Sequence, residues 1–123
     1  MDIPRGSRVL LVEDEVLLRK VMAEELRDEG YIVEEAANGA DAMIALANHF
    51  DVLLTDIRMA GRVNGWDLAE AARSIQTDIE VIYMTGYSGD IQKRVPRSEF
   101  IMKPCTVAQI VELMTTPSYG SST

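Results

Sequence analysis

The stretch that decides the fold is Val52-Leu53-Leu54-Thr55-Asp56. The run Val52–Thr55 is apolar at every residue but the last, which is typical of a strand covered on both faces of a parallel sheet. Asp56 follows directly, so a carboxylate stands where the strand ends. In open α/β sheets, ligands bind at the edge formed by the carboxyl ends of the strands. This segment therefore predicts a buried parallel strand with a functional acid at its end.

Working outward, three more short apolar runs end at polar residues in the same way. They are Val9–Val12 before Glu13 and Asp14, Val81–Met84 before Thr85, and Phe100–Met102 before Lys103. If these runs are parallel strands of one sheet, their terminal side chains gather with Asp56 at one edge. Three carboxylates, a hydroxyl and an ammonium together suit a divalent cation and a phosphoryl group.

Helical patterns separate the apolar runs, which predicts βα units and a parallel sheet. Ile32–Ala36 is a further, weaker strand. The expected helices run from about Val16 to Glu29, after Asn38-Gly39, after Asn64-Gly65, over a short stretch around Asp90–Arg94, and from Thr106, whose spacing to Gln109 fits a capping box. The count is five strands and about five helices, and right-handed crossovers place helices on both faces of the sheet.

Hydrophobic spacing also predicts which side chains the helices bury. For the first helix these are Leu18, Val21, Met22 and Leu26, and for the helix after Asn64-Gly65 they are Leu68, Ala72 and Ile75. Trp66, at the start of that helix, is expected to be partly exposed.

The composition is that of one ordinary globular domain, with 47% hydrophobic and 26% charged residues in a chain of 123. A net charge of -8 argues against direct nucleic-acid binding and against an anionic membrane surface. No apolar run is long enough to span a bilayer. The single cysteine, Cys105, cannot form an internal disulfide, which favours a reducing, cytoplasmic location. We divide the chain into an N-terminal extension (1–7), one domain (8–116) and a flexible C-terminal tail (117–123).

The predicted cluster has a definite chemistry. Glu13, Asp14 and Asp56 would repel one another unless a cation neutralised them. Oxygen-only ligands favour Mg²⁺ or Mn²⁺. Lys103 and Thr85 would then bind phosphoryl oxygens, and Asp56 would be the nucleophile that forms an acyl phosphate.

Each of these residues, taken singly, also has an ordinary explanation. Glu13 and Asp14 suit the N-terminus of a helix, Asp56 a strand end, Thr85 a turn, and Lys103 a solvated loop. Their shared position at successive strand ends, with complementary chemistry, favours a common site.

The chain resembles two-component response-regulator receiver domains. The resemblance lies in Val12–Glu15, Leu54–Met59, Met84–Gly86 and Met102–Pro104, which occur in the family's order, and it covers Val9 to Met114. It implies a flavodoxin-like, doubly wound (βα)5 fold with a five-stranded parallel sheet in the order 2-1-3-4-5.

The resemblance also implies roles. Asp56 would accept a phosphoryl group from a histidine kinase or a histidine phosphotransfer protein, and the protein would then change its contacts with a downstream protein, as a monomer or a phosphorylation-dependent dimer. Mg²⁺ would be held by Glu13, Asp14, Asp56 and the backbone carbonyl of Arg58. Lys103 and Thr85 would bind the phosphoryl oxygens, and Phe100 would turn inward when Thr85 moves.

Some features depart from the family pattern. Ala60 replaces the usual proline after Met59, and the loop 60–65 is one residue longer than in chemotaxis-type receivers. That longer loop resembles receivers of hybrid histidine kinases and of some stand-alone regulators, and Tyr83–Tyr87 loosely resembles a motif of alphaproteobacterial single-domain receivers. The interval from Thr85 to Lys103 is short, which predicts a shortened or irregular fourth helix.

Two other functional classes are open to such a sequence. A Mg²⁺-dependent phosphohydrolase resembling dehalogenases would usually carry a second aspartate two residues after its nucleophile, where this chain has Arg58. A degenerate receiver used only for protein contacts would not need Asp56, Thr85 and Lys103.

Arg58 and Tyr87 either shield an acyl phosphate from water or project into solvent. Because the residues after Met114 are too few for an output domain, we expect either a stand-alone receiver that acts through protein contacts or a piece of a larger protein.

Overall fold

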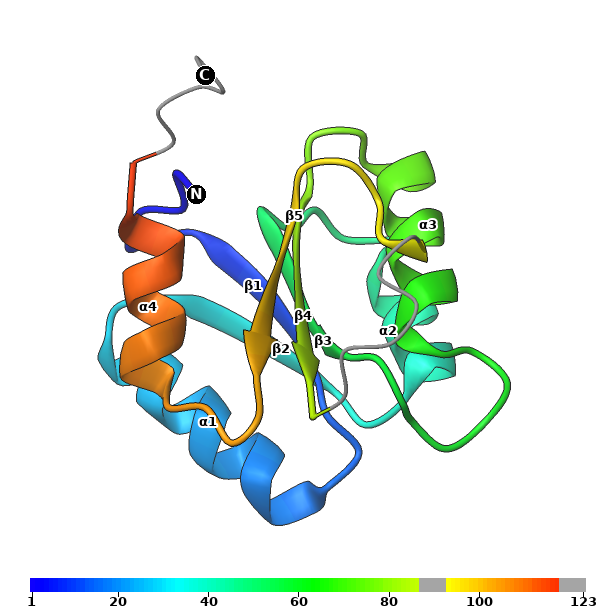
Figure 1. Cartoon of the computed structure of the whole chain (residues 1–123), viewed down its shortest axis with the longest axis horizontal. Coiled ribbons are helices and arrows are strands. Elements are labelled where there is room, and N and C mark those ends of the chain that lie inside the picture. Colours follow the sequence, from blue (N-terminus) through cyan, green and yellow to red (C-terminus); the bar gives the residue numbers. More distant parts are fainter. Residues whose placement is uncertain (87–92, 118–123) are drawn as a thin grey trace.

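The computed structural model describes residues 1–86 and 93–117 and shows a five-stranded parallel sheet with helices on both faces (Figure 1). The strands are β1 (Arg8–Val12), β2 (Ile32–Ala36), β3 (Val52–Asp56), β4 (Glu80–Thr85) and β5 (Ser98–Met102). Their order is β2-β1-β3-β4-β5, which confirms the predicted order. In the described part of the chain the helices are α1 (Val16–Asp28), α2 (Gly39–Ala45), α3 (Gly65–Ile75) and α4 (Val107–Thr115).

The predicted fourth helix, around Asp90–Arg94, falls mostly outside the described residues. Helix α4 is therefore the predicted last helix, and its capping box is present: the Gln109 N–H donates to Thr106 Oγ1, and the Thr106 N–H donates to the Gln109 side chain. Two more of the predicted helix starts are also capped, because Asn38 and Asn64 accept hydrogen bonds from the N–H groups of Asp41 and Asp67.

The sheet divides the core into two layers. Helices α1 and α4 cover one face and pack on Val9, Leu11 and Leu54. Helices α2 and α3 cover the other face and pack on Leu10, Leu53 and Tyr83. Every residue of β3 is buried, as predicted from its apolar run. Burial on both faces fixes the register of the strands, and the register fixes which residues reach the carboxyl edge.

Two predicted core positions were wrong. Val21 is 49% exposed, because the buried stripe of α1 runs through Arg19, Met22, Ala23 and Leu26 and leaves Val21 at its margin. Ile75, the last residue of α3, is 56% exposed. The next side chain, Gln76, turns inward instead and bonds the backbone of the α2–β3 connection.

The segment before β1 packs against the domain. Ile3 is buried, its N–H donates to the Met114 carbonyl, and its own carbonyl accepts from the Tyr31 hydroxyl. The expected N-terminal extension is therefore held at the end of α4 on the α1–α4 face.

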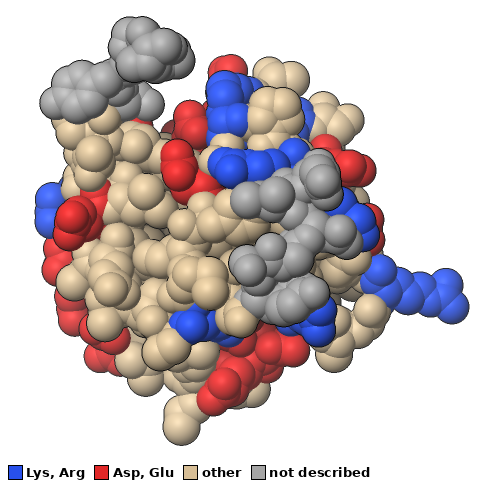
Figure 2. All heavy atoms as spheres, viewed as in Figure 1, with Lys and Arg blue, Asp and Glu red and all other residues tan. Residues whose placement is uncertain are grey.

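Charge is unevenly distributed over the surface. Figure 2 shows Lys and Arg side chains gathered around the connection that leads into β5, and largely uncharged surface over α4. Arg73 stabilises this region: it donates to the carbonyls of Ile79, Pro96 and Arg97, and so ties α3 to the connections before β4 and β5.

Candidate functional site

The carboxyl ends of β1 and β3 bring three acidic side chains together. Glu13 and Asp14 follow β1, Asp56 ends β3, and one carboxylate oxygen from each lies within 4.8 Å of the others. Glu13 is 1% exposed and Asp56 is 5% exposed, whereas Asp14 faces solvent. The residues line an open pocket of about 270 Å³ together with Arg58, Thr85 and Lys103. All the polar residues predicted at successive strand ends thus share one pocket.

Lys103 bridges the two buried acids. Its Nζ lies 2.7 Å from Asp56 Oδ1 and 3.0 Å from Glu13 Oε1. The position follows from the sheet, because β5 pairs with β4 up to Thr85 and Met102, and the Lys103 N–H then donates to the Thr85 carbonyl over 2.8 Å. The Lys103–Pro104 peptide bond is cis. A cation from the edge strand thus reaches the acids of the central strands.

The electrostatics of the site follow from burial of like charges. Burial, together with the hydrogen bond to Glu13, raises the pKa of Asp56 from 3.8 to about 7, against the opposing effect of Lys103. Burial also opposes ionisation of Glu13, but hydrogen bonds with Asp56, the Glu15 N–H and Lys103 outweigh it and lower the pKa of Glu13. Burial lowers the pKa of Lys103, but the carboxylates of Asp56 and Glu13 outweigh burial and raise this pKa overall. The ammonium therefore stays charged.

The start of α3 lies directly against the end of β3. The Gly65 N–H donates to the Ile57 carbonyl over 2.8 Å. A Cβ atom on Gly65 would lie only 2.3 Å from the Asp56 carbonyl oxygen and 2.7 Å from Ile57 Cα. Only glycine permits this approach, and the contact fixes the backbone that carries the Asp56 carboxylate.

Glu13 is anchored through every hydrogen-bonding group it has. Its N–H donates to Ala36 on β2, Oε2 accepts from the Glu15 N–H, and Oε1 accepts from Lys103. Its carbonyl accepts a buried hydrogen bond of 3.0 Å from Nη1 of Arg19. Sequence reasoning missed Arg19, because an arginine on an amphipathic helix is usually a surface residue.

Three aromatic rings pack beside the site on the α2–α3 face. The ring centroids of Tyr83 and Phe100 are 5.1 Å apart, and Trp66 lies 4.8 Å from Tyr83 and 6.0 Å from Phe100. The guanidinium of Arg94 lies 4.8 Å from the Phe100 ring centroid. Trp66 is only 8% exposed, so the expectation of a partly exposed tryptophan was wrong. Its ring is covered because Tyr83 and Phe100 are register partners on β4 and β5.

The donor set fits a hard divalent cation. Carboxylate oxygens are the ligands that Mg²⁺ prefers, and two of the three acids here are buried and share contacts with the Lys103 ammonium. Arg58 lines the same pocket. Tyr87, the other residue predicted near the phosphoryl site, lies outside the described residues.

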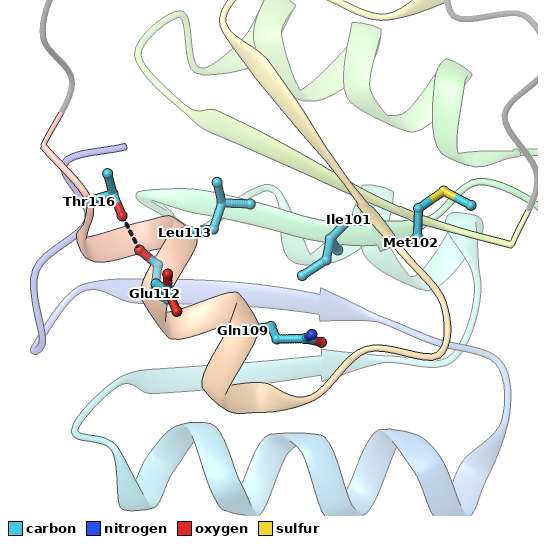
Figure 3. Close-up of a pocket in the computed structure, with 6 residues that line it drawn as sticks. All are labelled: Ile101, Met102, Gln109, Glu112, Leu113 and Thr116. Atoms are coloured by element: carbon cyan, nitrogen blue, oxygen red, sulfur yellow. Dashed lines mark hydrogen bonds between the residues drawn. The ribbon is translucent and has the colours of Figure 1, made fainter.

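A second surface pocket lies between β5 and α4 (Figure 3). It is lined by Ile101, Met102, Gln109, Glu112, Leu113 and Thr116. It shares no lining residue with the acidic pocket and contains one carboxylate, so it adds nothing to the chemistry described above.

A five-stranded sheet in the order 2-1-3-4-5, with an acidic pocket at its carboxyl edge, defines a flavodoxin-like receiver architecture. The family model of the response regulator receiver domain matches residues 9–115. The chain belongs to this family, and its function is that of a receiver domain in phosphorelay signal transduction.

Known relatives agree with this assignment. The chain is 32% identical over 116 residues to the sensor kinase CckA of Brucella abortus, covering 89% of this chain and 12% of the kinase. It is 37% identical over 83 residues to the response regulator receiver protein CpdR of the same organism, covering 67% of this chain and 68% of CpdR. A receiver protein from Sinorhizobium medicae superposes with a TM-score of 0.83 at 30% identity, covering 89% of this chain and 92% of that one.

The matched relatives include proteins much longer than this chain. The chain spans 12% of the sensor kinase and about half of the transcriptional regulatory proteins SilR and CusR. In the described residues, no helix is long and apolar enough to cross a membrane.

Proposed function

We propose that Asp56 is the residue that accepts the phosphoryl group. The observation that carries this proposal is the buried Asp56 carboxylate, 2.7 Å from the Lys103 ammonium, in a pocket that also contains Glu13, Asp14 and Thr85. The donor is a histidine kinase or a histidine phosphotransfer protein, and the similarity to a sensor kinase supports this. The protein acts as a phosphoacceptor that assists its own phosphorylation and dephosphorylation, in the cytoplasm.

Glu13, Asp14 and Asp56, with the backbone carbonyl of Arg58, would hold Mg²⁺ or Mn²⁺. The oxygen-only cluster and its burial support this ligand set. So does the response regulator protein TrrA of Thermotoga maritima, which is 29% identical with a TM-score of 0.75 and was solved in complex with Mg²⁺ and BeF. When bound, the ion would neutralise negative charge on the phosphoryl oxygens.

The residues then have separate tasks in the transfer. An Asp56 carboxylate oxygen attacks phosphorus, the bond from phosphorus to the donor atom breaks, and the donor group leaves with that electron pair. Lys103, already placed by Asp56 and Glu13, binds a phosphoryl oxygen. Thr85, at the end of β4, donates its hydroxyl to another. Transfer in such a site depends mostly on positioning and charge neutralisation.

Phosphorylation then changes the protein's contacts. The phosphoryl group adds roughly -1.5 to -2 charges and new acceptor oxygens at one point. Lys103 and Thr85 make better contacts with it than with the free acid, and only such a difference shifts a two-state equilibrium. We assign Phe100 as the switch that follows Thr85, because it lies on the neighbouring strand at the margin of the aromatic cluster.

The test is intact mass after incubation with Mg²⁺ and a small-molecule phosphodonor. The wild-type protein is expected to gain one phosphoryl group, and Asp56→Asn to gain none. Asp67→Asn, which changes an exposed aspartate on the adjacent helix, is the matched control and should react like the wild type. Modification of Asp56→Asn to the same extent as the wild type would place the acceptor elsewhere.

A further inference from the structure

Arg19 is the least expected side chain near the site. It lies on α1 one turn after the helix start, and its side chain is only 11% exposed. Arginine is almost never buried unless its donors are used. Here Nη1 donates over 3.0 Å to the Glu13 carbonyl in a buried hydrogen bond.

The bonded carbonyl belongs to the peptide that joins Glu13 to Asp14. Strand β1 ends at Val12, and the Glu13 N–H that still bonds to Ala36 of β2 belongs to the preceding peptide, between Val12 and Glu13. Because the peptide is planar, its orientation influences the directions in which the side chains of both flanking residues point. A donor fixed on its carbonyl oxygen therefore fixes the relative positions of two neighbouring carboxylates.

The Arg19 guanidinium is itself held by a carboxylate of β2. Arg19 Nε lies 3.4 Å from Oε1 of Glu35 on β2, a carboxylate whose side chain is 16% exposed. Glu35 also pairs with Lys20 and Arg27 of α1, at 3.1 and 3.4 Å. Burial opposes ionisation of Glu35, but these cations outweigh it and lower its pKa, so the carboxylate that orients Arg19 stays charged.

We propose that Arg19 is a positioning residue for the divalent-cation site, acting through the Glu13–Asp14 peptide rather than by contact with the ion. The inference rests on the proposed function, because it assumes that Glu13 and Asp14 hold the cation. Residues that orient metal ligands from behind typically change metal affinity by about 10–100-fold when they are removed.

The chain supplies a matched control for this role. Arg27 lies on the same helix and contacts the same Glu35 carboxylate at the same 3.4 Å, but its other hydrogen bond goes to the Val33 carbonyl on β2. Replacing either arginine by methionine removes one charge and one contact with Glu35. Only the Arg19 replacement frees the peptide between the two acids.

The experiment measures Mg²⁺ affinity by calorimetry, without phosphodonor, for the wild type, Arg19→Met, Arg19→Lys and Arg27→Met. We expect Arg19→Met to weaken Mg²⁺ binding about tenfold or more, Arg19→Lys to recover part of the loss, and Arg27→Met to stay within about twofold of the wild type. In phosphorylation assays the Arg19 variants should need more Mg²⁺ for half-maximal rate and recover at saturating Mg²⁺. If Arg19→Met does not fold, the test is the Mg²⁺ affinity of Arg19→Lys compared with the affinities of the wild type and of Arg27→Met.

Two results would overturn the inference while leaving the proposed function intact. One is wild-type Mg²⁺ affinity in both Arg19 variants of a protein that is phosphorylated normally. The other is a loss of Mg²⁺ affinity in Arg27→Met equal to that in Arg19→Met. Such a result would mean that weaker packing of α1 against β2, and not the Glu13–Asp14 peptide, causes the loss. A wild-type protein that neither binds Mg²⁺ nor accepts a phosphoryl group would overturn the proposed function, and this inference with it.

Discussion

Lys103 Nζ lies 2.7 Å from Asp56 Oδ1, so the cation at the end of β5 is already in contact with the acid at the end of β3. The same ammonium is 3.0 Å from Glu13 Oε1. The Lys103 ammonium thus contacts two buried carboxylates at once. Burial, together with the hydrogen bond to Glu13, therefore raises the pKa of Asp56 to about 7 despite the ammonium, with measurable consequences for stability and for cation binding.

The first prediction concerns the pH dependence of stability without divalent cations. The pKa of Asp56 is about 7 in the folded protein, whereas the ordinary value for an aspartate, which applies to the unfolded chain, is 3.8. Between these values the folded state holds a proton that the unfolded state has lost, so stability falls as pH rises through this window. Asp56→Asn removes the effect. Relative to the wild type, the free energy of unfolding of the variant should be little higher at pH 4 and on the order of 2–4 kcal/mol higher at pH 8. Urea unfolding in the presence of EDTA measures this difference. A difference that does not change with pH would contradict this account.

The second prediction is that Mg²⁺ binding displaces this proton. A cation needs the ionised carboxylate, so protons compete with Mg²⁺ below pH 7 and affinity should fall by up to about tenfold per pH unit there. Calorimetry in buffers of different ionisation enthalpy should detect release of nearly one proton at pH 6 and much less at pH 8. Asp56→Asn, which has no such proton, should bind Mg²⁺ more weakly and without this dependence. Proton release that persists in the variant would assign the titration to another group.

The third prediction concerns Gly65. Gly65→Ala would place a methyl group 2.3 Å from the Asp56 carbonyl oxygen, so the start of α3 or the end of β3 must move. We expect a loss of about 1–3 kcal/mol in unfolding free energy, with slower phosphorylation, because Asp56 moves with its backbone. Gly86→Ala is the control, since a Cβ there meets no atom of the described residues within 4 Å and its φ is outside the left-handed region. Its stability should stay within about 0.5 kcal/mol of the wild type. Equal effects of the two substitutions would count against the close contact.

The sequence predicted the sheet and the gathering of site residues because both depend on local signals. Short apolar runs mark strands, and in a parallel sheet all the strand ends lie at one edge. The structure confirms the fold class and strand order, and it places Glu13, Asp14, Asp56, Thr85 and Lys103 around one pocket.

Burial of individual side chains depends on partners that are distant in sequence, so the prediction for Trp66 was wrong and Arg19 was not singled out at all. Trp66 is buried because Tyr83 and Phe100 meet across β4 and β5. Arg19 is buried because the Glu13 carbonyl and the Glu35 carboxylate lie within its reach. Neither contact leaves a periodic pattern in the sequence.

The fourth prediction concerns Gln76, which joins the end of α3 to the α2–β3 connection. Its Oε1 accepts from the Phe50 N–H over 2.9 Å, and its Nε2 donates to the carbonyls of Leu46 and Asn48 over 3.1 and 2.7 Å. Gln76→Ala leaves these backbone groups without their partner and should cost about 1–3 kcal/mol in thermal or chemical unfolding. Ser74→Ala, an exposed change two residues earlier, should cost far less. A Gln76→Ala variant as stable as Ser74→Ala would show that water replaces all three bonds.

The last prediction uses the single tryptophan of the chain as a reporter of the proposed switch. The Trp66 ring centroid lies 6.0 Å from that of Phe100, so movement of Phe100 on phosphorylation should change Trp66 emission. With Mg²⁺ already saturating, the phosphodonor should shift the emission of the wild type but not of Asp56→Asn. Phe100→Leu should still gain one phosphoryl group by mass and lose most of the emission change. If Phe100→Leu is phosphorylated and its emission changes as in the wild type, the signal comes from the site itself, through Gly65 and Asp56, and Phe100 is not the switch.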